Sequence, residues 1–293
     1  MREQSVARKY SKRSRAGEVW HRLKKNKGAM IGLAIVVLLI VTAIASGFLL
    51  DYDTQIIAQS TMDRLQAPSA KHWMGTDQYG RDIFYRLLYG SRFSLSVGFV
   101  AVVVALLIGV PLGAVAGYFG GAVEDIIMRI TDIFAAVPNI LMGIVLVSAL
   151  GSNTINLMLA VGVTSVPQFV RVTRASVLTV RNQEYVEAAR AVGISEAKII
   201  FTHILPNCLS PIIVQTTLRI ASAIIAASSL SFLGLGVPVP APEWGAMLSE
   251  GRSFIRGYGY MTLFPGLAIM ITVLAFNMVG DGLRDALDPK LKK

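Results

Sequence analysis

Long stretches of this sequence contain no charged residue, although the whole chain carries a formal net charge of +10. The surface of a soluble domain carries charges at short intervals, whereas a helix that crosses lipid needs about 20 largely apolar residues in a row. Uncharged stretches of that length are residues 28–50, 93–123, 133–170 and 257–280, and residues 206–234 contain one charge, Arg219. This segregation predicts an integral membrane protein with several spans.

The number of predicted spans is six. Residues 133–170 are too long for one span, and Gly151-Ser152-Asn153-Thr154 interrupts them with residues typical of a tight turn. Only helices and closed barrels satisfy their backbone hydrogen bonds in lipid, and these stretches are far longer than barrel strands. We therefore expect an all-α integral membrane protein with six transmembrane helices.

The distribution of basic residues predicts the orientation in the membrane. Many Lys and Arg residues lie within residues 1–27, directly before the first span, and such clusters mark the cytoplasmic side and attract anionic lipid. Their position beside a span argues against nucleic-acid binding. With six spans, both termini are expected in the cytoplasm. Residues 17–27 are expected to form an interfacial helix on the inner leaflet, with a disordered basic tail as the alternative before Arg15.

The segment between the fourth and fifth spans has the pattern of two short helices around a break. Asn182 is expected to cap the first helix, and Gly193 to end it in a left-handed conformation. Ser195 is expected to cap the second helix, and Pro206 marks the entry to the fifth span. A bent helix pair with a patch of alanines and an acid, Glu187, suits docking into another protein.

Several residues of this segment carry a family resemblance. Glu187-Ala188-Ala189, followed by Gly193 and then Leu205-Pro206, resembles the EAA motif of ABC-importer permeases, with His203 where that family usually has isoleucine. The resemblance implies that this loop is the coupling helix that inserts into an ATPase subunit. The residues implied to couple to the ATPase are Glu187, Ala188, Ala189, Gly193, Ser195, Leu205 and Pro206.

Two further segments narrow the resemblance. Residues 75–82 with 86–95, and residues 277–289, are similar to the C-type membrane subunit of dipeptide and oligopeptide permeases, so the likeness covers nearly the whole chain. It implies an ABC type I importer permease fold, a second homologous permease, two ABC ATPases and an extracytoplasmic solute-binding protein. The implied substrates are short peptides, with nickel chelate, glutathione or another small solute as alternatives. The glycine-rich residues 75–82 are either a network of turns or a contact for the binding protein.

The resemblance and the spans together divide the chain. Its location is expected to be the cytoplasmic (inner) membrane of a bacterium or archaeon. The expected parts are a basic cytoplasmic segment (1–27), the first span (28–50), an extracytoplasmic loop (51–92), a core permease domain with five spans (93–284) that contains the coupling loop (171–206), and a cytoplasmic tail (285–293).

The sequence gives no sign of chemistry performed by the chain itself. It has no Gly-rich loop of the form GxxxxGK[ST], so ATP and Mg²⁺ are expected on the partner ATPases. His21, His72 and His203 stand in no metal-ligand or nucleophile pattern, and we expect no catalytic residue, metal or cofactor. A stand-alone secondary transporter or channel is less favoured, because it would need no docking loop.

Arg219 and Ser222 on the fifth span are the candidates for the translocation path. A buried arginine is costly in a membrane and usually pairs or faces water. Arg219 is expected either to line the passage and meet a peptide carboxylate, or to form an interhelical ion pair or a contact with a partner permease. On the second span, Gly109, Gly113 and Gly117 recur at four-residue spacing and predict close packing against another helix.

Overall fold

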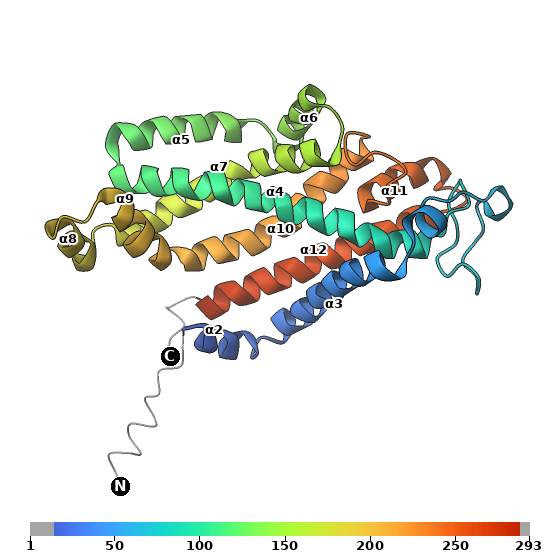
Figure 1. Ribbon diagram of the computed structural model, residues 1–293, viewed down its shortest axis with the longest axis horizontal. Helices are drawn as coiled ribbons and strands as arrows, with labels where there is room; N and C mark the ends of the chain where they lie inside the picture. The colour runs from blue at the N-terminus through green and yellow to red at the C-terminus, as the bar shows by residue number, and fades with distance from the viewer. Residues whose placement is uncertain (1–14, 288–293) are drawn as a thin grey trace, which may run out of the picture.

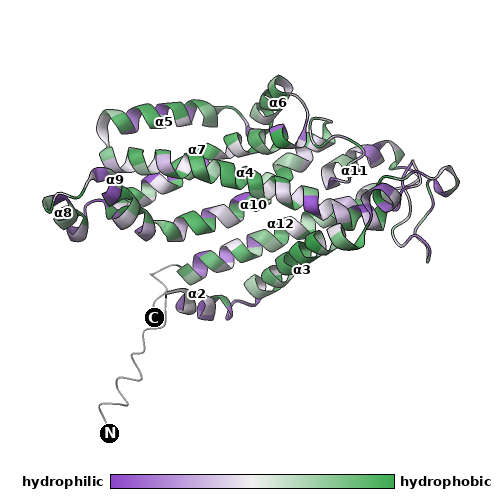
Figure 2. Ribbon diagram, in the orientation of Figure 1, coloured by the Kyte–Doolittle hydropathy of each residue, from purple (hydrophilic) through white to green (hydrophobic). Residues whose placement is uncertain are grey.

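The computed structural model describes residues 15–287, and these are mostly helical (Figure 1). A bent pair of helices, α5 (Gly121–Ala136) and α6 (Asn139–Leu150), turns by 91° at its break. If this pair is counted as one span, the described residues contain the six spans that the sequence predicts. The other five are α3 (Lys27–Leu49), α4 (Ile83–Phe119), α7 (Thr154–Val180), α10 (Leu209–Phe232) and α12 (Tyr260–Leu287). Apolar residues dominate their length, and polar residues gather toward the two ends (Figure 2).

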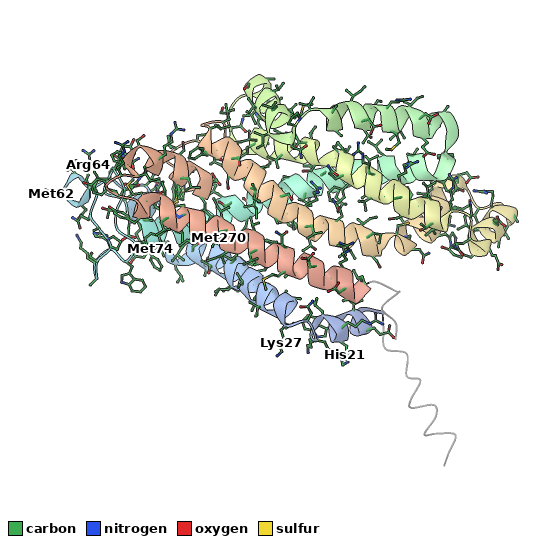
Figure 3. All side chains as sticks on the ribbon, turned by 180° about the vertical axis from the view of Figure 1, so that it is seen from behind. His21, Lys27, Met62, Arg64, Met74 and Met270 are labelled. Atoms are coloured by element: carbon green, nitrogen blue, oxygen red, sulfur yellow. The ribbon has the colours of Figure 1, made fainter. Side chains whose placement is uncertain are left out.

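Shorter helices lie at the two ends of the bundle. They are α2 (Arg15–Leu23), α8 (Glu184–Ala191), α9 (Glu196–Ile199) and α11 (Trp244–Gly251), with single turns η1 (Tyr52–Ile56), η2 (Thr61–Asp63) and η5 (Arg252–Phe254). Met62 and Arg64 lie at the opposite end of the molecule from His21 and Lys27 (Figure 3). We call the end with α2, α8 and α9 the inner end, and the other the outer end.

The predicted helix before the first span is present as α2. Its Leu23 is buried against Ala29 of α3 and Ala286 of α12, so part of its apolar side packs on the bundle, while Trp20 remains exposed. The rest of the basic N-terminal segment, residues 1–14, and the tail from residue 288 lie outside the described residues.

The boundaries of the second and third spans differ from the sequence-based expectation. The second helix begins at Ile83, before the uncharged stretch, and ends at Phe119. Gly120 and Gly121 then adopt φ values of +69° and +52°, which favour glycine, and the third span starts at Gly121. The sequence placed that start at residue 133 because α5 carries charges. Two of these charges are paired with α7: Asp132 with Arg171, and Glu124 with Arg174.

The bend between α5 and α6 follows from Pro138. Proline disfavours a helical conformation in the residue before it, and Val137 is indeed extended, with φ −86° and ψ 130°. The predicted break at residues 151–154 is confirmed, because Gly151 has φ +91° and the Asn153 side chain accepts a hydrogen bond from the Asn156 N–H to cap α7.

The glycine face of α4 packs directly against α7, as its spacing predicts. A Cβ added to Gly109 would lie 2.6 Å from Phe169 Cβ, and one on Gly113 would lie 2.5 Å from the Val170 carbonyl oxygen. Gly162 of α7 returns the contact, since its Cβ would lie 2.9 Å from the Ala101 carbonyl. The two backbones therefore approach closely at several successive turns of the helices.

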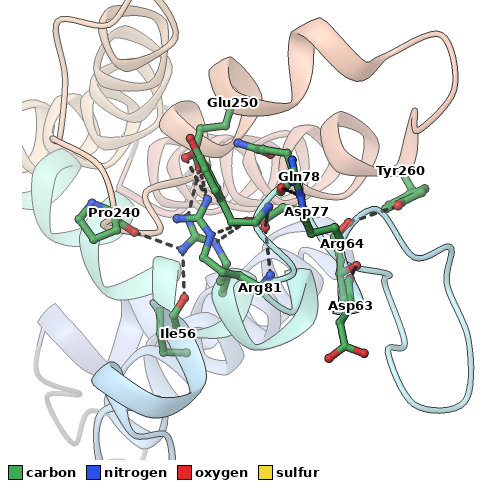
Figure 4. Close-up of polar contacts among 12 residues, drawn as sticks. Ile56, Asp63, Arg64, Asp77, Gln78, Arg81, Pro240, Glu250 and Tyr260 are labelled. Carbon is green, nitrogen blue, oxygen red and sulfur yellow. Dashed lines mark hydrogen bonds and ion pairs between the residues drawn. The ribbon is translucent and has the colours of Figure 1, made fainter. Parts of the chain in front are cut away.

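A buried cluster of charges closes the outer end (Figure 4). Asp77 accepts a hydrogen bond from Arg81 Nε at 2.6 Å, and Arg81 Nη2 reaches Glu250 of α11 at 2.9 Å. Arg86, whose exposed fraction is 1%, donates to Glu250 at 3.2 Å and to the carbonyls of Ile56 and Pro240 at 3.0 and 3.1 Å. Two guanidinium groups and two carboxylates thus join the start of α4 to α11 and to the loop after α3.

The glycine-rich residues 75–82 form a network of turns. Gly75 and Gly80 have φ values of +77° and +79°, and a Cβ on Gly80 would lie 1.9 Å from the Ser60 carbonyl oxygen. The Thr76 carbonyl accepts a hydrogen bond from Tyr260 Oη at 3.2 Å, which ties the turns to α12. The sequence left open a network of turns or a contact for the binding protein, and the network of turns explains why glycine stands at these positions.

We predict that Glu250→Gln destabilises the protein by about 3 kcal/mol, because it removes one carboxylate from a buried cluster and leaves two guanidinium groups facing Asp77 alone. The midpoint of thermal unfolding in detergent, followed by tryptophan fluorescence, measures the effect. Asp53→Asn, which neutralises an exposed acid in the same outer region, is the control and should leave the midpoint unchanged. Equal midpoints for both variants and the parent would refute a stabilising role for the cluster.

We predict that Gly113→Ala lowers stability by about 1–3 kcal/mol, because its methyl group would press on the Val170 backbone and push α4 away from α7. Gly266→Ala is the matched control: its Cβ would meet Leu248 Cδ2 at an ordinary 3.9 Å. The yield of monodisperse protein and its unfolding midpoint are the measurements. If the two alanine variants behave alike, the close α4–α7 approach is not a stability determinant.

Candidate coupling surface and transport path

The segment that joins α7 to α10 projects from the inner end of the bundle (Figure 1). After α7 the chain forms α8, turns at Val192-Gly193, and continues through α9 into a π-helical turn, η3 (Ile200–Ile204), and a 3-10 turn, η4 (Leu205–Asn207). These turns lead without a break into α10. We call residues 181–208 the α8–α9 segment.

Gly193 creates the bend of this segment. Its φ is +82°, and its N–H donates to the Arg190 carbonyl at 3.0 Å, while the Ile194 N–H reaches back to the Ala189 carbonyl at 3.2 Å. This left-handed helix end matches the prediction made from the sequence. The φ value rather than crowding favours glycine, because a Cβ at Gly193 would meet nothing within 4 Å.

The predicted helix caps are less accurate. Asn182 does not cap α8: Gln183 occupies the N-cap position, and its backbone carbonyl accepts from Val186 N–H and Glu187 N–H at 2.8 and 3.2 Å. Ser195 stands at the N-cap of α9 as predicted, but its side chain makes no capping hydrogen bond. Neither helix start therefore has a side-chain cap.

The residues of the EAA-like motif divide between two faces. Ala189 is buried beside Val186 in a cluster with Val177, Ile199 and Ile204. Glu187 and Ala188 are exposed on the other side of α8, together with Val192, whose exposed fraction is 82%. Further along, Leu205 is half-buried, and Ser195 and Pro206 are exposed. One face of the segment is therefore fixed to the bundle. The other carries an acid and small or apolar side chains that no residue in the range 15–287 covers.

Three polar side chains that the sequence reasoning missed hold the segment to α4. Tyr118, in the last turn of α4, donates its hydroxyl hydrogen to the Glu196 carboxylate and accepts a hydrogen bond from Arg190 Nη2 at 2.9 Å. Arg190 Nε lies 3.6 Å from Glu196 Oε1. The hydrogen bond to Tyr118 raises the pKa of Arg190 above its ordinary value. We call Tyr118, Arg190 and Glu196 the tyrosine clasp.

The transport-path candidates lie on α10. Arg219 is half-buried and makes no hydrogen bond or ion pair with any residue in the described range 15–287. Ser222 is exposed and donates its hydroxyl hydrogen to the Leu218 carbonyl at 3.3 Å, one turn back on the same helix. Within the described residues the two side chains lie three positions apart and share no direct contact. The interhelical ion pair considered for Arg219 is therefore not formed within this part of the chain.

The chemistry open to the described residues is limited. They contain no group of three or more His, Cys, Asp and Glu side chains that could hold a metal ion. Burial raises the pKa of the Cys208 thiol to about 11, so this thiol stays protonated at neutral pH and is a poor nucleophile.

Comparison with known proteins agrees with this arrangement. A family model described as binding-protein-dependent transport system inner membrane component matches residues 109–293. A second, described as the N-terminal TM domain of oligopeptide transport permease C, matches residues 14–68.

Individual relatives extend the likeness over the chain. A dipeptide transport system permease protein of Alkalihalophilus pseudofirmus is 50% identical over 94% of this chain and 90% of its own length. A glutathione transport system permease protein of Pectobacterium atrosepticum is 46% identical over 98% of this chain and 95% of its own.

A solved structure of the MetNI methionine ABC transporter, in an inward-facing conformation, shares the fold. One of its chains superposes with a TM-score of 0.59 at 17% sequence identity and covers 70% of this chain and 98% of its own. Taken with the family models and the relatives, these matches show that the chain belongs to the family of binding-protein-dependent transport system inner membrane components.

Proposed function

We propose that this chain is one of two permease subunits of an ATP-driven importer of dipeptides and oligopeptides in the cytoplasmic membrane of a bacterium or archaeon. A second, homologous permease completes the translocation path, and an extracytoplasmic solute-binding protein delivers the peptide at the outer end. Two ABC ATPases hydrolyse ATP with Mg²⁺, and one of them docks on the α8–α9 segment of this chain. The chain itself binds no cofactor and catalyses no reaction.

The two-faced α8–α9 segment carries this proposal. Its buried face, with Val186 and Ala189, moves with the bundle, while the exposed face offers Glu187 and Ala188 to a partner. A coupling segment must be attached to the membrane helices that it moves, and it must also expose a surface to which the ATPase can bind. Glu187 would supply a carboxylate to a basic group of the ATPase, and Gly193, Ser195, Leu205 and Pro206 shape the segment that presents it.

The proposed mechanism is alternating access. Closure of the ATPases on ATP displaces the α8–α9 segment, and the helices rock from an inward-open to an outward-open state and return after hydrolysis. We propose the topology that this requires: both termini in the cytoplasm, residues 28–50 as a peripheral first span, and a core of five spans that contains the coupling loop. Because α4 begins at Ile83, the outer loop between the first two helices is shorter than residues 51–92.

The substrate class rests on the relatives. Dipeptide and glutathione permeases both match along nearly the whole chain, and glutathione is itself a short peptide with free carboxylates. Import of glutathione is the second candidate. The test measures uptake of labelled dialanine, trialanine and glutathione by the complete complex in vesicles. Saturable ATP-dependent uptake of the alanine peptides without glutathione identifies a dipeptide and oligopeptide importer, and the reverse result identifies a glutathione importer.

We predict that Glu187→Lys reduces ATP-dependent peptide uptake at least about tenfold, because it places a positive charge against a basic partner surface. Uptake by right-side-out or reconstituted vesicles and co-purification of the ATPases are the measurements. Glu18→Lys, the same charge reversal at an exposed inner-end site on α2, is the control and should keep full uptake. Unchanged uptake by the Glu187 variant would argue against docking at this face.

We predict that Arg219→Ala raises the KM for peptide uptake about tenfold with little change in assembly, because a peptide carboxylate loses its guanidinium partner. Arg219→Lys should recover part of the affinity, and Ser222→Ala should have a smaller effect. Initial uptake rates across a range of peptide concentrations give KM and maximal rate separately. Loss of the second permease from the purified complex, with KM unchanged, would instead assign Arg219 to a subunit contact.

A further inference from the structure

The α8–α9 segment is attached to three helices in different ways. It continues covalently into α7 through residues 181–183 and into α10 through η3 and η4. Its attachment to α4 is made by side chains: the tyrosine clasp, the hydrogen bond from Arg181 Nη1 to the Gly117 carbonyl at 2.8 Å, and apolar packing against Ala114. A displacement of the segment reaches α7 and α10 through the backbone, whereas these contacts are its direct route to α4.

Tyr118 is the centre of this attachment. Its side chain is largely buried, and its hydroxyl is bonded to α8 through Arg190 and to α9 through Glu196. The two partners lie on either side of the Gly193 bend. The Tyr118 hydroxyl is therefore hydrogen-bonded to both helices of the segment, and a movement of either helix acts on it. Arg190 and Glu196 are about half exposed, so their own ion pair is weak in water and depends on the hydroxyl for its geometry.

The helix that carries Tyr118 is suited to pass motion onward. α4 is 37 residues long and runs from the clasp to the outer charge cluster around Arg86. Its glycine face leaves no gap against α7, as the 2.5 Å distance at Gly113 shows. A packed helix of this kind moves as a rigid body, so a shift at its inner end is felt at its outer end.

We propose that Tyr118 is a positioning residue for transport: its hydroxyl passes the displacement of the α8–α9 segment to α4, so that nucleotide-driven movement at the inner end opens the outer end. This proposal rests on the proposed function as an ATP-driven importer. It assigns to the clasp a role in coupling, separate from the docking of the ATPase, which the exposed face performs.

The test compares Tyr118→Phe with Tyr85→Phe in the complete complex reconstituted in vesicles. Tyr118→Phe keeps the ring packing and removes both hydroxyl bonds. Tyr85, near the start of α4 and outside the α8–α9 segment, is exposed, and its hydroxyl has no hydrogen bond with the described residues. We expect Tyr118→Phe to lower peptide uptake per ATP hydrolysed about fivefold, with the ATPase rate within about twofold of the parent. Tyr85→Phe should match the parent in both.

A second comparison guards against a merely structural effect. Glu196→Ala should reproduce the loss of coupling, and the double variant Tyr118→Phe/Glu196→Ala should lose little more than either single variant, because both remove the same link. Additive losses, or parental uptake per ATP for Tyr118→Phe, would overturn the proposal. So would failure of the ATPases to co-purify with Tyr118→Phe, since the hydroxyl would then be needed for docking.

The same measurements separate this proposal from the one on which it rests. If the parental complex hydrolyses ATP but takes up neither peptide nor glutathione, the proposed function is wrong. If the parental complex transports peptide and Tyr118→Phe transports equally well per ATP, the function stands and the clasp has no part in coupling.

Discussion

The direct contact between the backbones of α4 and α7 is the constraint on which the rest of the structure depends. Lipid offers no hydrophobic gain for bringing two apolar helices together, so close packing must supply the attraction. Gly109 and Gly113 on α4, with Gly162 on α7, remove the side chains that would hold the helices apart. The contact turns two flexible spans into one unit, around which α10 and the bent α5–α6 pair are arranged.

This unit is fixed at both ends by polar groups outside the apolar part of the helices. At the outer end, Arg86 at the start of α4 is held by Glu250 and two backbone carbonyls. At the inner end, Tyr118 is held by Arg190 and Glu196. The apolar middle of the two helices holds them together, and the polar groups at the ends determine which other elements the helices are attached to. Such a division suits a protein whose two ends must respond to different partners.

The sequence predicts the features that depend on local composition. Uncharged stretches located the spans, the four-residue spacing located the glycine face, and Gly193 located the bend between α8 and α9. The third span began earlier than predicted because α5 carries charges whose partners, Arg171 and Arg174, come from a distant helix.

The missed contacts share that physical reason. Tyr118 meets residues 72 and 78 positions away, and Arg86 meets one 164 positions away. Neither contact leaves a local pattern in the chain. The cap predicted at Asn182 failed for a different reason, because α8 begins one residue later and Gln183 occupies the N-cap position.

Arg219 lies on a side of the bundle where no other residue of the described chain pairs with it. An arginine at the centre of a spanning helix costs about 2.5–3.5 kcal/mol or more unless water or a partner solvates it. The arginines at the outer end, Arg81 and Arg86, are each paired with carboxylates, whereas Arg219 meets no carboxylate in the part of the chain that the structure describes. Within residues 15–287, the buried arginines at and before the start of α4 are thus paired, whereas Arg219 in the middle of α10 has no ion pair. Because a guanidinium in hydrocarbon is costly without a gain elsewhere, we propose that this side of α10 faces water or a second subunit, as half of a shared passage would.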